Sequence, residues 1–256
     1  TVKCLDCGLV FVNRRLNAQG RDKYYANYYM EEHQAVAEAA VRDKMYQLEF
    51  DFIHKHINGG KILDVGCSGG DFLKYFNDAG FECFGVEPAL DAVKIARERI
   101  DGEIINSGLC EANINERFDL IVFRGTIEHI PDGRDTLLKA VKLLKDNAPS
   151  MVYITSTPNI GCFCADLFKT NWTQHLPEEH IYHFRKSHFD TLFGNLGMTC
   201  IDEYYFYEET PYADVSNDIL KVAEAIKLKN RNQPIEFKSP PFYGNMMSLV
   251  YTNNRE

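Results

Sequence analysis

Between residues 61 and 155 the chain alternates short apolar runs with amphipathic segments. The runs at 120–123 and 151–155 are almost continuously apolar, which is typical of strands buried on both faces of a sheet. Predicted strands are 62–65, 83–87, 103–106, 120–123 and 151–155, and predicted helices between them are 71–79, 91–99 and 134–144. This strand–helix order predicts an α/β fold with a mostly parallel sheet and helices on both faces.

The flanking segments complete this picture. An apolar stripe of Met45, Leu48 and Phe52 predicts a helix over 34–57, and another helix over 186–195 ends before Gly197. Segments 199–205 and 246–251 are predicted to finish a seven-stranded, Rossmann-like sheet as an antiparallel pair. We therefore expect an N-terminal segment, 1–33, and one domain, 34–256, with a small substrate cap at 159–184, where no periodicity is found.

Composition narrows the possible partners. The 28 basic and 37 acidic residues give a net charge of −9, which argues against a nucleic-acid or anionic-membrane surface. No apolar run approaches the roughly 18 residues of a membrane span, and no signal-peptide pattern is found. Eight cysteines in 256 residues are too sparse for a disulfide framework. We expect a cytoplasmic protein with reduced thiols that acts on a small molecule, and the sequence leaves its oligomeric state open.

The turn that follows the first predicted strand is the most informative segment. Gly66 and Gly70 remove side chains where the backbone turns tightly, at the strand end where open parallel sheets bind ligands. A dinucleotide-binding turn needs glycines two and five residues after Gly66, but Ser68 and Asp71 stand there. An acid at 71 would also repel a diphosphate, so dinucleotide binding is excluded.

The turn instead resembles motif I of class I methyltransferases, which bind S-adenosylmethionine and release S-adenosylhomocysteine. Asp64, Gly66 and Gly70 match the motif, and Ser68 replaces its middle glycine. The resemblance implies that this loop, including Cys67, wraps the methionine half of the cofactor. It also implies that Asp64 lies near the ammonium group or is held by loop amides.

A second acid supports this resemblance. Glu87, before Pro88, ends the next predicted strand, where a carboxylate can accept hydrogen bonds from both ribose hydroxyls. Many relatives carry an aspartate for the adenine amine where this chain has Leu109, which implies an apolar adenine site with backbone contacts. Further cofactor-binding residues implied by position are Cys110, Arg124 and Gly125.

The resemblance extends over about residues 1–205, through segments 118–122, 127–132, 143–145, 157–159 and 179–184 in family order. It is closest to methyltransferases of polysaccharide, sugar-nucleotide and secondary-metabolite pathways. It implies O-methylation of a sugar or phosphorylated precursor in surface-polysaccharide biosynthesis. Two alternatives stay open: a cofactor-binding or interaction module without catalysis, and a methyltransferase of a quinone-like or secondary-metabolite acceptor.

His129 follows the fourth predicted strand, close to where the transferred methyl group should project. In similar small-molecule O-methyltransferases a histidine near this position is the base, although a residue that only packs the loop fits the sequence equally. Glu128-His129 also resembles the Glu-His pair of quinone-biosynthesis enzymes. Their further metal-binding glutamate stands four residues earlier, where this chain has Gly125, so no metal is predicted.

The predicted cap holds a dense polar cluster. His180 is the strongest candidate there for a catalytic role, and Trp172, Tyr182 and His183 are candidate substrate-binding residues. Arg124 and Arg185 are each interpreted either as partners of an anionic substrate or as members of a surface salt bridge.

Two N-terminal features allow two interpretations each. Cys4 and Cys7 resemble half of a zinc ribbon, but tetrahedral zinc needs four ligands, so a turn that packs hydrophobic residues is favoured. Tyr28 and Tyr29 either close over the cofactor sulfonium, which an aromatic face stabilises, or cover the edge of the sheet.

Overall fold

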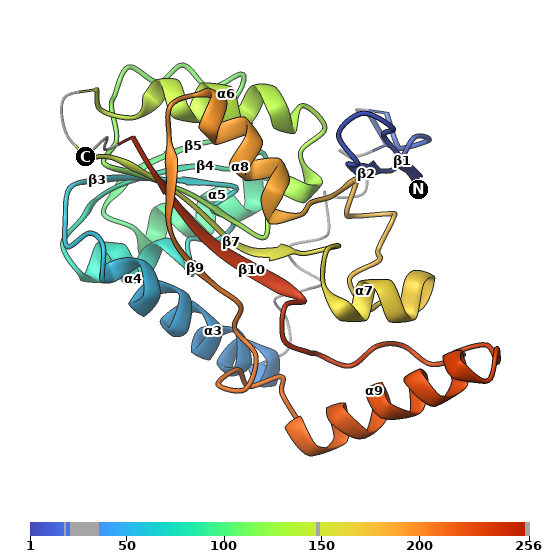
Figure 1. Cartoon of the computed structure of the whole chain (residues 1–256). Coiled ribbons are helices and arrows are strands. Elements are labelled where there is room, and N and C mark those ends of the chain that lie inside the picture. The colour runs from blue at the N-terminus through green and yellow to red at the C-terminus, as the bar shows by residue number, and fades with distance from the viewer. Residues whose placement is uncertain (18, 21–35, 147–148, 254–256) are drawn as a thin grey trace.

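A seven-stranded sheet forms the centre of the protein (Figure 1). The computed structural model describes residues 1–17, 19–20, 36–146 and 149–253. In spatial order the strands are β5 (Gly102–Ile105), β4 (Glu82–Val86), β3 (Lys61–Val65), β6 (Leu120–Arg124), β7 (Met151–Pro158), β10 (Met246–Thr252) and β9 (Thr199–Tyr204). The chain order reverses between β3 and β6, so the carboxyl ends of these two strands flank a topological switch point.

Strand direction follows the prediction from sequence. Neighbours from β5 to β7 pair in parallel, and β10 runs antiparallel to both β7 and β9. The predicted α/β class, with a mostly parallel sheet and an antiparallel closing strand, is confirmed. Strand β7 extends beyond the predicted run to Pro158, because Met246 and Met247 of β10 pair with its last residues.

Two apolar layers enclose the sheet. Helices α6 (Gly133–Leu143) and α8 (Lys186–Asn195) pack on one face through Leu137, Ala140 and Phe193. Helices α3 (Val36–His54), α4 (Leu73–Asp78) and α5 (Leu90–Arg99) cover the other face (Figure 1). With apolar contacts on both sides, alternate residues of the central strands enter different cores, which explains their continuous hydrophobicity.

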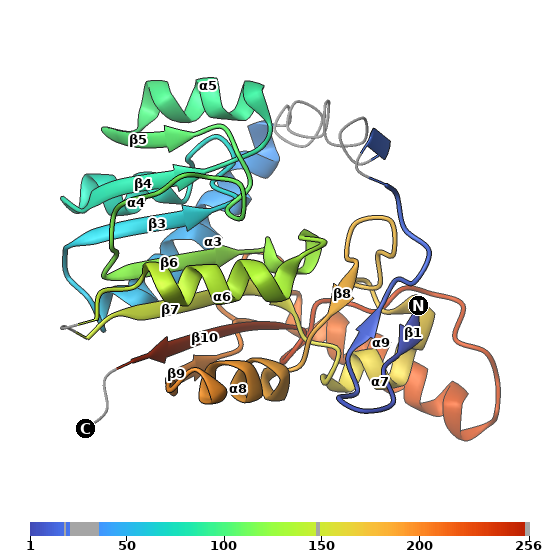
Figure 2. The same cartoon turned by 90° about the horizontal axis from the view of Figure 1, so that it is seen from above.

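A second, small sheet lies beyond the carboxyl ends of the main strands (Figure 2). The N-terminal strands β1 (Val2–Lys3) and β2 (Val10–Phe11) form a hairpin, and β2 pairs with β8 (Tyr182–His183) from the predicted cap. Helix α7 (Phe163–Phe168) and the 3₁₀ turns η1 (Ile127–His129) and η2 (Lys169–Asn171) complete this end. The beginning of the chain is therefore hydrogen-bonded to the cap.

Helix α9 (Val215–Asn230) was not predicted from the sequence. The segments on either side of this helix are polar. It buries only a narrow stripe, including Val222 and Ala225, against α7 and the cluster around Trp172. Ile219 and Leu220 stay exposed, so the apolar residues of α9 do not form one clear stripe. No helix within the described ranges is both long and apolar enough to span a membrane.

Candidate functional site

The turn after β3 is built for close approach of a ligand. Gly66 has φ +76°, and a Cβ there would lie 2.5 Å from Cγ2 of Thr126, so only glycine fits. Gly70 has φ +79°, and Ser68 also adopts the left-handed region with φ 49°. The turn is held by its own amides, because those of Gly66 and Cys67 donate to the carbonyl of Val86 and that of Gly70 donates to the carbonyl of Cys67.

Asp64 is a buried carboxylate at this switch point. Its Oδ1 atom has no hydrogen-bond partner among the described residues. Burial raises the pKa of Asp64 to about 7; the nearby Glu87 adds to this and Arg124 opposes it. An unsatisfied buried carboxylate oxygen is costly, and a cationic ligand group placed beside it would remove that cost.

Glu87 follows β4 and faces the same turn. Its carboxylate accepts from the backbone nitrogen of Ser68 at 3.1 Å and from that of Ala89 at 2.7 Å. Burial raises its pKa, and these two amide hydrogen bonds oppose the rise. Asn106 donates to the carbonyls of Glu87 and Pro88, which fixes the strand end. The carboxylate is thus oriented by the loop, with lone pairs left for a diol.

The other predicted cofactor residues surround this turn in different ways. Cys67 is buried, and a Cβ on Gly85 would lie 2.6 Å from its sulfur, so β4 and the turn are in close contact. Leu109 is buried in the core that includes Val65 and Val86. The Cys110 thiol lies 3.4 Å from the hydroxyl of Thr136, and burial raises its pKa.

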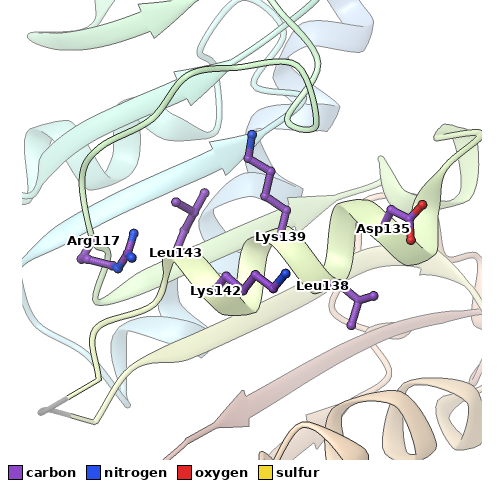
Figure 3. A pocket seen from close by; sticks show the side chains of 6 residues that line it. All are labelled: Arg117, Asp135, Leu138, Lys139, Lys142 and Leu143. Atoms are coloured by element: carbon purple, nitrogen blue, oxygen red, sulfur yellow. The ribbon is translucent and has the colours of Figure 1, made fainter.

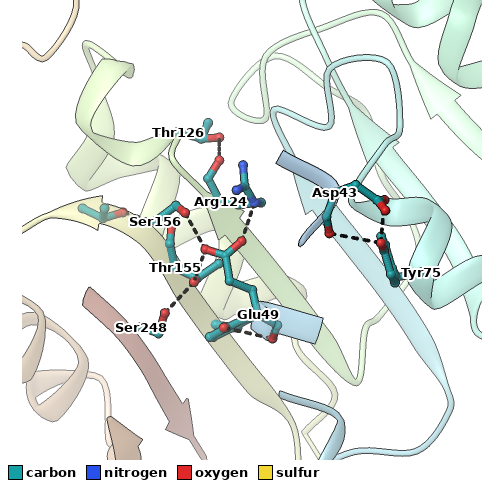
Figure 4. A network of polar contacts seen from close by, with 10 residues as sticks. Asp43, Glu49, Tyr75, Arg124, Thr126, Thr155, Ser156 and Ser248 are labelled. Carbon is teal, nitrogen blue, oxygen red and sulfur yellow. Dashed lines mark hydrogen bonds and ion pairs between the residues drawn. The ribbon is translucent and has the colours of Figure 1, made fainter. Parts of the chain in front are cut away.

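Arg124, at the end of β6, is held within the chain (Figure 4). Its Nε donates to Glu49 of α3 at 2.6 Å, and its guanidinium lies 4.3 Å from the ring centroid of Tyr46. Glu49 is fully buried and also accepts from Thr155 at 3.0 Å and from Ser156. Removing one partner of a buried ion pair destabilises the folded protein by about 3–5 kcal/mol. The Arg124 side chain is therefore held in place by Glu49.

Glu49 was missed by the reasoning from sequence. The signal was an acid between Leu48 and Phe50 on a helix whose neighbouring residues are apolar. Charged residues are almost never fully buried unless they are paired, so an acid there points to a basic partner elsewhere in the chain.

The two predicted catalytic histidines meet at the carboxyl edge of the sheet. His129 belongs to η1, and His180 lies in the cap, yet their ring centroids are 4.9 Å apart in an edge-to-face arrangement. One ligand atom from each ring and one carboxylate oxygen of Glu128 lie within 4.8 Å of one another. The structure therefore brings together two residues that are 51 positions apart in the sequence.

Burial controls the charge of this trio. It lowers the pKa of His129 to about 3, with help from His180, while a hydrogen bond to the backbone of Glu179 opposes the shift. The pKa of His180 is also lowered by burial, and that of Glu128 is raised to about 8. Both imidazoles are therefore neutral at pH 7, and each keeps a nitrogen lone pair.

Of the predicted substrate residues, His183 lies beside the trio and Trp172 lies beside His183. His183 is fully buried, its ring is 6.4 Å from that of His180, and neither of its nitrogens has a partner in the described part of the chain. Burial lowers its pKa to about 4. Nε1 of Trp172 is likewise buried and without a described partner, whereas the Tyr182 hydroxyl donates to the carbonyl of Pro131 at 2.7 Å.

Cys4 and Cys7 lie in the turn between β1 and β2, and His188 bonds the carbonyl of Cys7 at 3.2 Å. Tyr28 and Tyr29 lie outside the described residues.

A separate hollow of about 490 Å³ runs along α6 (Figure 3). Its lining residues are Arg117, Asp135, Leu138, Lys139, Lys142 and Leu143. None of these belongs to the switch point or the histidine trio. Lys139 is already bonded to the carbonyls of Cys110 and Ala112, so the hollow is not the candidate site.

Sequence comparisons agree with this geometry. A family model described as a methyltransferase domain matches residues 25–203. A ubiquinone biosynthesis O-methyltransferase of Actinobacillus pleuropneumoniae is 30% identical over 129 residues, which cover 44% of this chain and 53% of that protein. One from Azorhizobium caulinodans is 29% identical over 109 residues, 40% of this chain and 42% of the relative. The chain thus spans about half the length of these curated relatives.

Solved structures share the fold at low identity. A possible histamine N-methyltransferase of Thermotoga maritima aligns with TM-score 0.59 and 14% identity, over 91% of this chain and 98% of that one. Magnesium protoporphyrin IX methyltransferase of Synechocystis PCC 6803, with bound S-adenosylhomocysteine, aligns with TM-score 0.57 and 12% identity, over 93% and 96%. These likenesses confirm the fold alone.

Proposed function

We propose, since this chain belongs to the methyltransferase-domain family, that it transfers a methyl group from S-adenosylmethionine to an oxygen atom of a small polar acceptor. The observation that carries the choice of acceptor atom is the meeting of His129 and His180 beside the switch point. In this proposal both are catalytic residues that contact the acceptor, while Trp172, Tyr182 and His183 form the acceptor side of the site.

The residues at the switch point fit the cofactor. The bound cofactor supplies a positively charged sulfonium whose methyl group is open to in-line displacement. The unsatisfied oxygen of Asp64 suits a cationic group, and the oriented carboxylate of Glu87 suits the ribose hydroxyls. Gly66 and Gly70 keep the turn clear of side chains. The chain's own contribution is alignment of the two reactants.

Two observations support oxygen as the accepting atom. A hydroxyl must lose its proton as the new bond forms, and two neutral imidazoles offer lone pairs to groups that carry such a proton. The named relatives are O-methyltransferases, although they are partial matches. The proposed acceptor is a sugar or phosphorylated sugar precursor of a surface polysaccharide, with Arg15, whose guanidinium bonds the Tyr182 hydroxyl at 3.2 Å, available to an anionic group.

A quinone-like or secondary-metabolite acceptor is the second candidate. It is favoured by the names of the relatives, which act in ubiquinone biosynthesis. Aromatic and sugar hydroxyls differ strongly in acidity, so one panel of acceptors separates the two candidates.

The proposal is tested by incubating the protein with methyl-labelled S-adenosylmethionine and a panel of sugars, sugar phosphates, nucleotide sugars and catechols. We expect label in one acceptor class, with an O-methyl group in the product by NMR and mass spectrometry. Methyl transfer to nitrogen or carbon instead would overturn the choice of oxygen. Binding of both cofactor forms without any transfer would favour a non-catalytic cofactor-binding module.

Cofactor binding should also be linked to a proton at Asp64. The raised pKa of about 7 means that, between about pH 4 and pH 7, this carboxyl is protonated in the folded protein and ionised in the unfolded chain. A cationic ligand group favours the carboxylate, so binding should release up to about one proton at pH 6 and almost none at pH 9. Affinity should fall by up to about tenfold per pH unit below 7.

Calorimetry in buffers of different ionisation enthalpy measures this proton release directly. The substitution Asp64→Asn is expected to abolish this proton release. It should also remove the loss of stability that the raised pKa of Asp64 causes as the pH rises from about 4 to about 7. Release that persists unchanged in Asp64→Asn would show that another group, such as Glu87, is responsible.

A further inference from the structure

We propose that Glu128, His129 and His180 together bind one divalent transition-metal ion, such as Zn²⁺ or Fe²⁺, at the junction of η1 and the cap. One carboxylate and two imidazoles are a ligand set suited to such ions. Their ligand atoms lie within 4.8 Å of one another in the structure. Bonds of 2.0–2.1 Å place neighbouring ligands roughly 3–3.5 Å apart, so the side chains need to close by at most about 1.5 Å.

Hydrogen bonds hold the two imidazoles as metal-binding histidines are held. Nδ1 of His180 lies 2.9 Å from the carbonyl oxygen of Gln174, and this bond requires the N–H at Nδ1 and leaves the lone pair at Nε2. His129 is also hydrogen-bonded to the backbone of Glu179. Metal ligands usually donate their second ring N–H to a carbonyl or carboxylate, which fixes the tautomer and the ring orientation.

The ligand atoms of the trio lie close to one another. Two imidazole lone pairs and the Glu128 carboxyl group face one small volume. The carboxyl group accepts from the Thr157 hydroxyl at a long 3.3 Å and from its own backbone amide. Arg124, whose charge acts on Glu128, is engaged by Glu49. Glu128 is only 1% exposed, and a buried carboxylate without a paired cation is costly. A bound cation would satisfy all three groups at once.

His183 provides independent support. It is completely buried beside His180, and both of its ring nitrogens lack a partner in the described part of the chain. Such groups in a folded protein usually face a ligand, an ion or an ordered water. Next to the trio, His183 is placed to bond a water or a ligand atom on the ion's open side.

The inference rests on the proposed function in one respect: the open coordination positions would take the acceptor's hydroxyl oxygen. With the ion bound, the lone pairs of His129 and His180 serve as ligands, so the ion, in place of an imidazole, would promote loss of the hydroxyl proton, which passes to water. Metal coordination makes a bound hydroxyl more acidic, so the acceptor would be an alcohol or phenol that reaches the ion. Ion binding itself does not depend on methyl transfer, and the two are measured separately.

The test uses metal-free protein with Cys4→Ser and Cys7→Ser, so that thiolates cannot bind the added ion. Zn²⁺ is titrated by calorimetry, and Co²⁺ is titrated by its absorption spectrum. We expect one ion per chain, and we expect His129→Asn, His180→Asn and Glu128→Gln each to weaken binding by at least about 100-fold. His56→Asn is the matched control, since His56 also lies against a carboxylate, that of Asp202 at 2.8 Å.

Far-UV circular dichroism and cofactor binding show whether each substituted protein is folded. Should one fail to fold, ¹⁵N NMR of the histidine rings in the Cys-to-Ser protein gives the answer, because Zn²⁺ must shift the ring nitrogens of His129 and His180. No saturable binding, or binding that His180→Asn leaves unchanged, would overturn the proposal. An ion bound by the trio in a protein that methylates nothing would uphold it while the proposed function fails.

Discussion

Replacing Glu87 by Ala is expected to weaken binding of S-adenosylhomocysteine by about 100-fold, or roughly 3 kcal/mol. Two charge-assisted hydrogen bonds to the ribose would be lost together. The backbone nitrogens of Ser68 and Ala89 would also lose their acceptor, so the turn would be less ordered before the cofactor arrives. Isothermal titration calorimetry with the demethylated cofactor measures the change without interference from turnover.

Glu87→Gln keeps one carbonyl oxygen and should lose only about tenfold, because its hydrogen bonds are no longer charge-assisted. Glu82→Ala is the matched control at the opposite end of β4, where the side chain forms an exposed ion pair with Lys61 at 3.0 Å. This control should leave cofactor affinity unchanged. Equal affinity in Glu87→Ala and the natural protein would remove Glu87 from the cofactor site.

Replacing His129 by Asn is expected to reduce the rate of methyl transfer by about 10²–10⁴-fold, with cofactor affinity within about twofold of the natural protein. The imidazole meets His180 on the acceptor side, whereas Asp64 and Glu87 lie around the cofactor turn. A catalytic role therefore affects kcat and leaves the affinity for S-adenosylhomocysteine in place.

Single-turnover rates and calorimetry on the same preparation separate these quantities. His180→Asn should behave in the same way, and His56→Asn should keep full activity. A loss of cofactor binding as large as the loss of rate would mean that His129 supports the loop and does not contact the acceptor. Normal turnover in His129→Asn would leave His180 as the sole candidate.

The central fold and the cofactor turn were accessible from sequence for identifiable reasons. Strands such as β6 and β7 are buried on both faces, so their hydrophobicity is nearly continuous. At position 66 the positive φ and the close contact with Thr126 require glycine, so the turn can be recognised from the residue type alone. Local constraints of this kind are visible without knowledge of distant residues.

Features that depend on distant residues were not accessible. Glu49 and Arg124 are 75 positions apart, and only packing of α3 on the sheet reveals that they form a pair. The sequence predicted a catalytic role for His129 and for His180 separately. The short distance between their rings arises because the cap folds over η1. Helix α9 buries too narrow a stripe to show a clear periodicity.

The hairpin that pairs with β8 has a consequence for protein engineering. Val10 and Phe11 lie opposite His183 and Tyr182, and the amide of Val12 bonds the carbonyl of Ile181 at 2.9 Å. A chimaera that takes residues 159–184 from a relative but keeps the original residues 1–12 would pair a β2 and a β8 that did not evolve together. The first dozen residues and the cap are therefore best exchanged as one unit, although residues 13–158 lie between them.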